Sequence, residues 1–197
     1  MSFRITLATT GRVLAQLRRD PRTLAMIVVV PCILIALVKW MFDGDEATFQ
    51  RVGVPLLGIF PLISMFLITS IAMLRERTSG TLERLMSLPV GRFDLLLGYG
   101  IAFALVAVVQ ASLASAVAFG LLGLDVEGSV ALVVALAVSN AVLGMALGLF
   151  LSAFASTEFQ AVQFMPAVIL PQLLLCGLLV PRDLMAPVLD WISSPFR

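Results

Sequence analysis

The chain has 197 residues, of which 60% are hydrophobic and only 13% charged, and its mean hydropathy is +1.08. A soluble globular domain carries about 25% charged residues, so this composition excludes that class and predicts a polytopic membrane protein. Histidine is absent, and Cys32 and Cys176 each lie inside an apolar run. We therefore expect no histidine- or cysteine-based metal site and no structural disulfide, with both cysteines acting as small apolar side chains.

The first 22 residues predict a basic amphipathic helix that lies on the inner membrane surface. Phe3, Leu7, Leu14 and Leu17 recur at heptad-like spacing, and arginines surround them. Such a helix places its apolar side chains toward the acyl chains and its basic side chains among the headgroups. The alternative is a solvated basic leader that only sets the topology.

Five apolar runs follow, each long enough to cross a bilayer, whose hydrocarbon core of about 30 Å takes roughly 20 helical residues. No ionisable residue lies at the centre of any run, and no soluble domain interrupts the series. We therefore predict an all-α integral membrane fold with one transmembrane domain. The predicted spans are residues 23–42, 52–74, 95–124, 128–157 and 159–180.

The basic residues predict the orientation of these spans. Nine of the thirteen precede the first span or separate the second from the third. Because cytoplasmic loops carry an excess of Lys and Arg, the N-terminus is expected in the cytoplasm. The loops expected outside hold Asp43, Asp45, Glu46, Arg51, Asp125 and Glu127.

Residues 75–89 form a charged segment between two charge-free spans, and they predict a short helix at the membrane surface. Gly80 or Thr81 can begin this helix. Glu83 then lies in the first turn, where a negative charge suits the helix dipole. Pro89 ends the helix within about two turns.

This short helix has an apolar face, because Leu82, Leu85 and Met86 follow the i, i+3, i+4 spacing. A capped helix of this kind in the cytoplasm is suited to being held by a soluble partner. The alternative is a plain loop, in which Glu83 and Arg84 only maintain solubility and the leucines lie on lipid.

Several motifs are missing from the sequence. There is no G-x-x-x-x-G-K-[ST], so the chain cannot bind nucleotide through a P-loop. There is no G-x-S-x-G or H-E-x-x-H to indicate an enzyme. Ion-coupled carriers usually have a carboxylate at mid-membrane, and none is present in the spans. The energy for any transport must therefore come from elsewhere.

Three segments resemble the ABC-2 type transporter permeases. The strongest is Arg75-Glu76-Arg77-Thr78-Ser79-Gly80-Thr81-Leu82-Glu83-Arg84-Leu85, followed by Pro89. It is similar to the family's charged stretch that ends in Gly-Thr-Leu-Glu, then a Pro, between the second and third spans. Gln16-Leu17-Arg18-Arg19-Asp20-Pro21-Arg22 resembles the start of the daunorubicin-resistance and nodulation-factor exporters. Pro171 to Pro181, with Arg182-Asp183-Leu184, resembles the family's fifth span and the external segment after it.

The resemblance implies a non-catalytic permease subunit of an ATP-binding-cassette exporter in a bacterial inner membrane. A cytoplasmic ATPase subunit would bind ATP and Mg, so this chain would hold no cofactor, and a second permease chain would complete the path. The expected substrate is an amphipathic drug, antibiotic or lipid-like compound, and no nucleic acid is involved. In the family, the segment matching 80–88 is a coupling helix in a groove of the ATPase. The expected coupling residues are Glu76, Gly80, Thr81, Leu82, Glu83, Leu85, Met86 and Pro89.

A few polar and aromatic side chains in the spans are candidates for the substrate path. They are Phe66, Gln110, Asn140 and Gln163. Hydrogen bonds between neighbouring helices and ordinary packing are the alternative roles for them. On the fourth span, the small-xxx-small pattern of Gly144 and Gly148 predicts close helix packing, either within the chain or at a dimer seam.

Other functions remain open at this stage. Within the family, the alternative is a permease for lipo-oligosaccharide or polysaccharide, although only 8% of the residues are aromatic and sugar stacking favours more. An alternative from another class of function is a non-transporting membrane scaffold, which recruits a soluble protein through residues 75–89. A channel or carrier without a motor is a third.

Residues 181–197 are too polar and too interrupted by proline to span a membrane. Leu184, Val188, Trp191 and Ile192 follow helical spacing and are expected to lie in the outer interface. The family has six spans, so we expect the natural reading frame to continue into one more.

Overall fold

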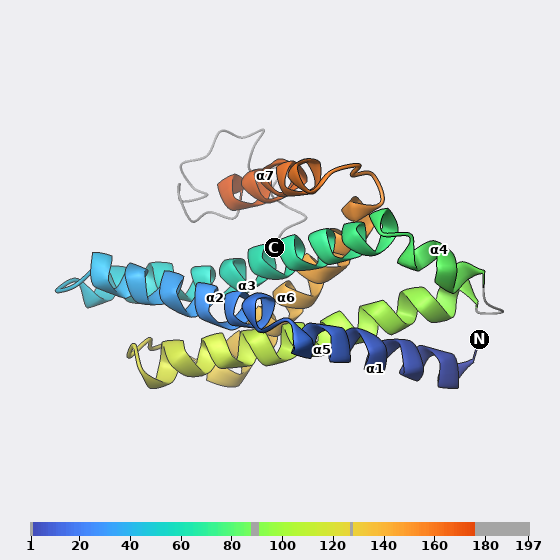
Figure 1. Cartoon of the computed structure of the whole chain (residues 1–197). Coiled ribbons are helices and arrows are strands. Elements are labelled where there is room, and N and C mark those ends of the chain that lie inside the picture. The colour runs from blue at the N-terminus through green and yellow to red at the C-terminus, as the bar shows by residue number, and fades with distance from the viewer. Residues whose placement is uncertain (1, 88–90, 127, 176–197) are drawn as a thin grey trace.

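The computed structural model describes residues 2–87, 91–126 and 128–175, and the regular secondary structure in these ranges is entirely helical (Figure 1). The predicted all-α fold is thereby confirmed. The helices are α1 (Phe3–Arg19), α2 (Pro21–Met41), α3 (Glu46–Thr78), α4 (Thr81–Met86), α5 (Arg92–Gly120), α6 (Val130–Ser152) and α7 (Glu158–Leu175).

Four of these helices, α2, α3, α5 and α6, are long and apolar enough to cross a membrane. They coincide with the first four predicted spans, although α3 continues past the apolar run as one helix of 33 residues. Helix α7 begins the fifth predicted span. The remainder of that span, Cys176 and the interfacial segment predicted at 181–197 lie outside the described residues.

Asp20 makes the junction between α1 and α2. Its Oδ1 accepts a hydrogen bond from the Thr23 backbone N–H at 3.2 Å, and its Oδ2 accepts one from the Thr23 hydroxyl at 2.6 Å. The hydroxyl bond and then the backbone bond lower the pKa of Asp20, so a negative charge is held at the positive end of α2. Pro21 occupies the first helical position, where no N–H is needed. Two separate helices result.

Helix α1 turns its threonines toward the bundle. Thr6, Thr9 and Thr10 are buried, whereas Phe3 and Leu7 are exposed. The Thr10 hydroxyl is satisfied by the carbonyls of Thr6 and Gly98, at 2.9 and 3.1 Å. A hydroxyl that bonds its own helix can be buried at little cost. Phe3 and Leu7 lie on the outer face of α1, whereas Leu14 packs against the core and Leu17 lines a groove.

Helix α3 packs most extensively against α6, and the small residues of α6 make this approach possible. A Cβ atom built on Gly144 would lie 2.2 Å from the Leu62 carbonyl oxygen, and one built on Gly148 would lie 2.5 Å from that of Phe66. The two glycines therefore bring α6 against α3 within the same chain, as small residues do between membrane helices.

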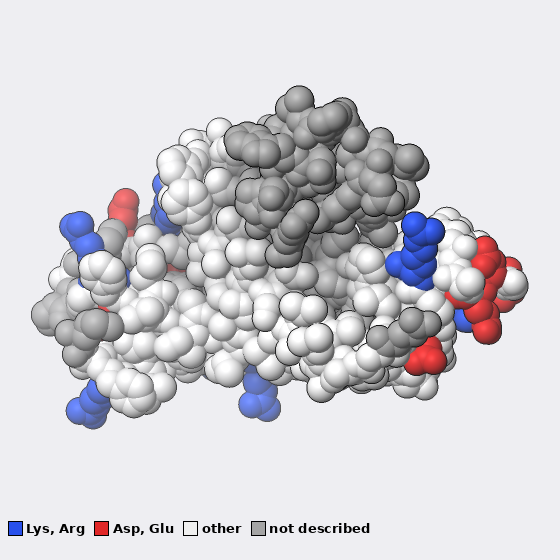
Figure 2. Space-filling model, turned by 180° about the vertical axis from the view of Figure 1, so that it is seen from behind, with Lys and Arg blue, Asp and Glu red and all other residues white. Residues whose placement is uncertain are grey.

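The long helices α2, α3, α5 and α6 alternate in direction, so the connections between them gather at two ends (Figure 1). At one end, the Gln50 side chain donates to the Gly123 carbonyl at 3.1 Å and joins the start of α3 to the α5–α6 connection. Acidic side chains gather at this end (Figure 2). The other end carries α1, α4 and the α6–α7 connection. Its exposed arginines are Arg4, Arg18, Arg19, Arg22, Arg75, Arg84 and Arg92.

Candidate coupling site and membrane groove

A single glycine turn separates α4 from α3. Gly80 has φ 71°, in the left-handed region, and a Cβ built on it would meet nothing within 4 Å. Glycine is therefore favoured here by the left-handed backbone conformation, which it adopts without steric cost, and not by a lack of space for a side chain. The Gly80 carbonyl accepts the first α4 bond from Arg84 N–H at 3.1 Å. Helix α4 begins at Thr81 with Glu83 in its first turn, where the sequence placed both.

The side chains of α4 divide between the chain itself and the outside. Glu83 and Arg84 are exposed, and Leu85 is half-buried. Leu82 and Glu83 line a hollow of about 280 Å³ together with Leu74 of α3 and residues of the α6–α7 connection. Leu82 therefore faces its own chain in part. The side chain of Met86 and the whole of Pro89 lie outside the described part of the chain.

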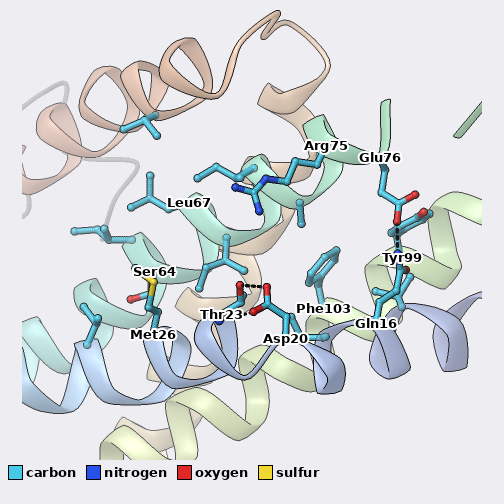
Figure 3. Close-up of a pocket in the computed structure, with 18 of the residues that line it drawn as sticks. Gln16, Asp20, Thr23, Met26, Ser64, Leu67, Arg75, Glu76, Tyr99 and Phe103 are labelled. Carbon is cyan, nitrogen blue, oxygen red and sulfur yellow. Dashed lines mark hydrogen bonds between the residues drawn. The ribbon is translucent and has the colours of Figure 1, made fainter. Parts of the chain in front are cut away.

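Glu76, an expected ATPase contact, has its partners within this chain. Its side chain is only 12% exposed, and its Oε1 lies 3.4 Å from Arg12 Nη1 in an ion pair. The Gln16 amide donates to the same oxygen at 3.1 Å. Arg12 also donates to the Tyr99 hydroxyl and lies 5.4 Å from the centre of that ring. The cluster joins α1, α3 and α5 (Figure 3).

A groove of about 800 Å³ runs beside this cluster, along α3 between α2 and α7 (Figure 3). Along α3 it extends from Phe60 to Glu76, or about 24 Å at 1.5 Å per helical residue. Its walls are mainly aliphatic side chains, and most of its polar groups collect at the end near α1, whereas Ser64 lies farther along α3. The polar groups near α1 are Gln16, Asp20, Thr23, Arg75, Glu76, Ser79 and Thr81.

The sequence missed this groove. Ile63, Leu67 and Ile71 recur along α3 at a spacing of four residues, followed by Arg75. Residues 52–74 contain no charged side chain, so the sequence does not show which face of this span lines a groove. The four predicted path residues do not come together here, and none of them lines the groove. Phe66 and Gln110 are buried and Asn140 is half-buried, whereas Gln163 is exposed on α7.

Gln110 has a structural partner. Its Nε2 donates to the Ile27 carbonyl at 2.9 Å, from α5 to α2. Pro31 lies four residues after Ile27 within α2 and has no N–H, so it leaves that carbonyl without its helical donor. Gln110 supplies the missing hydrogen bond. Asn140 similarly lies against the α3 backbone, with its Nδ2 2.8 Å from where a Gly58 Cβ would stand.

The fold and this site define a class of protein: a helical membrane protein with a short helix displayed between two spans. Among the residues that the structure describes, no group of three or more His, Cys, Asp or Glu side chains is placed to hold a metal ion.

The chain belongs to the ABC-2 type transporter family, whose model matches residues 5–197. The resemblance drawn from residues 75–89 is thereby confirmed. Two proteins, from Escherichia coli K12 and O157:H7, are each described as "Probable multidrug ABC transporter permease YbhR". Each is 29% identical over 146 residues, which cover 72% of this chain and 39% of the relative. The chain thus spans well under half the length of these relatives. No solved structure matches it.

Proposed function

We propose that this chain is the membrane permease subunit of an ATP-binding-cassette exporter, and that a separate cytoplasmic subunit hydrolyses MgATP to drive it. The observation that carries the proposal is α4, a short helix that the family signature forms between two spanning helices. These 197 residues contain no P-loop, so they do not bind nucleotide through one, and the family supports a partner subunit as the motor. Its relatives in Escherichia coli carry the description of ABC transporter permeases.

The proposed arrangement places α1 and α4 in the cytoplasm of a bacterial cell, at the inner membrane. The gathering of exposed arginines at that end supports this orientation, because positive residues remain on the cytoplasmic side. A second permease chain, identical or different, would complete the path. Among the described side chains of α4, Glu83 and Arg84 are exposed and Leu85 is partly exposed, and these three are proposed to meet the ATPase.

The proposed substrate is an amphipathic drug, antibiotic or lipid-like compound. The groove along α3 supports this class, because its aliphatic walls suit an apolar body and its polar end suits a headgroup. Export of a lipo-oligosaccharide or polysaccharide is the runner-up. The few aromatic residues of the chain favour the first reading, since sugars stack on aromatic rings.

The test is to express the chain with a candidate P-loop ATPase and to measure co-purification and ATP-dependent uptake of a fluorescent amphiphile by inside-out vesicles. Leu85→Asp should abolish both, because burying an unpaired carboxylate in an interface costs several kcal/mol. Leu121→Asp is the matched control: Leu121 is 79% exposed at the opposite end, and its substitution should preserve both activities. Uptake without ATPase, or full coupling by Leu85→Asp, would contradict the proposal.

A further inference from the structure

Three consecutive residues at the end of α3, Arg75, Glu76 and Arg77, each bind a different part of the bundle. We infer that this triplet, called here the α3 junction, transmits the movement of α4 to α1, α6 and α7 at once. The inference rests on the proposed function, since it takes α4 as the element that the ATPase moves. It assigns these side chains a positioning role inside the permease.

The Glu76 arm reaches α1 and, through it, α5. The carboxylate is paired with Arg12 and also accepts from Gln16, both on α1. Arg12 continues the connection to the hydroxyl of Tyr99 on α5. Because Glu76 is largely buried, breaking this arm would leave a charge with little access to water. The Glu76–Arg12 ion pair should therefore remain intact while α4 moves.

The Arg75 arm reaches the start of α7. Its Nε and Nη2 donate to the two carboxylate oxygens of Glu158, at 2.7 and 3.3 Å. Glu158 lies in the first turn of α7, where its charge also suits the helix dipole. Both side chains are more than half exposed, at 62% and 51%. Water can replace an exposed pair at little cost, so this arm can open and close.

The Arg77 arm reaches the end of α6. Its guanidinium donates to the carbonyl of Ser152, the last residue of that helix. The final carbonyls of a helix lack intrahelical donors, and a cation there also complements the helix dipole. Arg77 thus ties the C-terminal ends of α3 and α6 together, close to the hollow beside α4.

The three arms diverge because successive residues of a helix are rotated by about 100°. In Figure 3, the side chains of Arg75 and Glu76 leave α3 in different directions, one toward the groove and the other toward Tyr99 and Gln16. Helix α3 stays regular to Thr78, and Ser79 N–H bonds the Arg75 carbonyl at 2.9 Å. Gly80 N–H bonds the Arg77 carbonyl at 3.2 Å. The turn that starts α4 is therefore hydrogen-bonded to the junction residues themselves, and a rotation of that turn displaces all three arms.

The experiment measures transport per ATP hydrolysed in the complete exporter, reconstituted with its ATPase. Glu76→Gln should retain ATPase binding and hydrolysis but lower this ratio about tenfold, the scale of one charge-assisted hydrogen bond. The charge exchange of Arg12→Glu with Glu76→Arg should recover part of the loss. Glu46→Gln is the matched control: it also lies on α3 and pairs with Lys39 at 3.9 Å, but at the opposite end. Its ratio should stay within about twofold of wild type.

The outcomes separate the two proposals. A purely structural role for Glu76 would reduce the amount of folded complex, and so hydrolysis and transport together, with the ratio unchanged. An unchanged ratio in a transporting system would therefore overturn the α3 junction alone. A wild-type chain that engages no ATPase would overturn the proposed function and the junction with it. If Glu76→Gln does not accumulate in the membrane, Arg77→Gln takes its place with the same expected ratio, because it removes the charge-assisted hydrogen bond from the half-buried Arg77 to the Ser152 carbonyl.

Discussion

Replacing Gln110 by leucine should destabilise the bundle, and the effect should depend on a proline in another helix. The Gln110 side chain is 1% exposed and donates to the Ile27 carbonyl at 2.9 Å. That carbonyl has no helical donor, because Pro31 occupies the position whose N–H would bond it. In Gln110→Leu, a buried backbone acceptor is left unsatisfied.

The expected loss of stability follows from two estimates of the hydrogen bond and from one term that opposes them. An unsatisfied buried carbonyl costs about 1–3 kcal/mol, whereas hydrogen bonds between membrane helices average about 0.6 and reach about 1.7 kcal/mol. Leucine also removes the Gln110 Oε1, which is buried without a hydrogen-bond partner. We therefore expect a loss of about 1–2 kcal/mol in the free energy of unfolding.

A double-mutant cycle checks the mechanism. Pro31→Ala restores an N–H that can bond the Ile27 carbonyl, so Gln110→Leu should cost about 1 kcal/mol less in that background. Unfolding can be followed in mixed micelles of dodecyl sulfate and a mild detergent. Gln163→Leu, the same substitution at an exposed position of α7, is the control and should be near neutral. Additive effects of Gln110→Leu and Pro31→Ala would refute the assignment.

Three further predictions follow from the packing, the charge pairs and the two ends of the bundle. Gly148→Ala should cost about 1–3 kcal/mol in the same unfolding assay because of its tight contacts, whereas Gly100→Ala, with nothing within 4 Å, should be neutral or stabilising. The hydrogen bond from Arg75 lowers the pKa of Glu158 below its ordinary value of 4.5. The stability that ionised Glu158 contributes is therefore present above pH 4.5 and is lost as the pH falls through the lowered pKa. Below that pKa, the difference in unfolding temperature between wild type and Glu158→Gln should vanish. A cysteine at Asp45 should react with an impermeant thiol reagent outside intact cells, and one at Ser79 should not; the reverse pattern would invert the topology.

The prediction of α4 shows how far local rules reach. A left-handed glycine, an acidic first turn and flanking apolar runs all act on a few neighbouring residues, so the sequence is enough to place the start of α4 at Gly80 and Thr81. The first span was likewise predicted at residues 23–42, close to α2 (Pro21–Met41), although the helix break and cap at Asp20 were not predicted. The helical class and the first four spans depend on such local signals.

The partners of the polar side chains were decided by the tertiary structure. Gln110 meets Ile27 across 83 residues of sequence, and Arg77 meets Ser152 across 75. Nothing in the sequence distinguishes the buried face of a span from the lipid-facing one, because both are apolar. The sequence alone therefore left Gln110 open between a substrate path and a hydrogen bond to a neighbouring helix, and it suggested that Glu76 meets the ATPase. Packing placed Gln110 on an orphaned carbonyl and Glu76 against Arg12, because such contacts depend on which helices become neighbours.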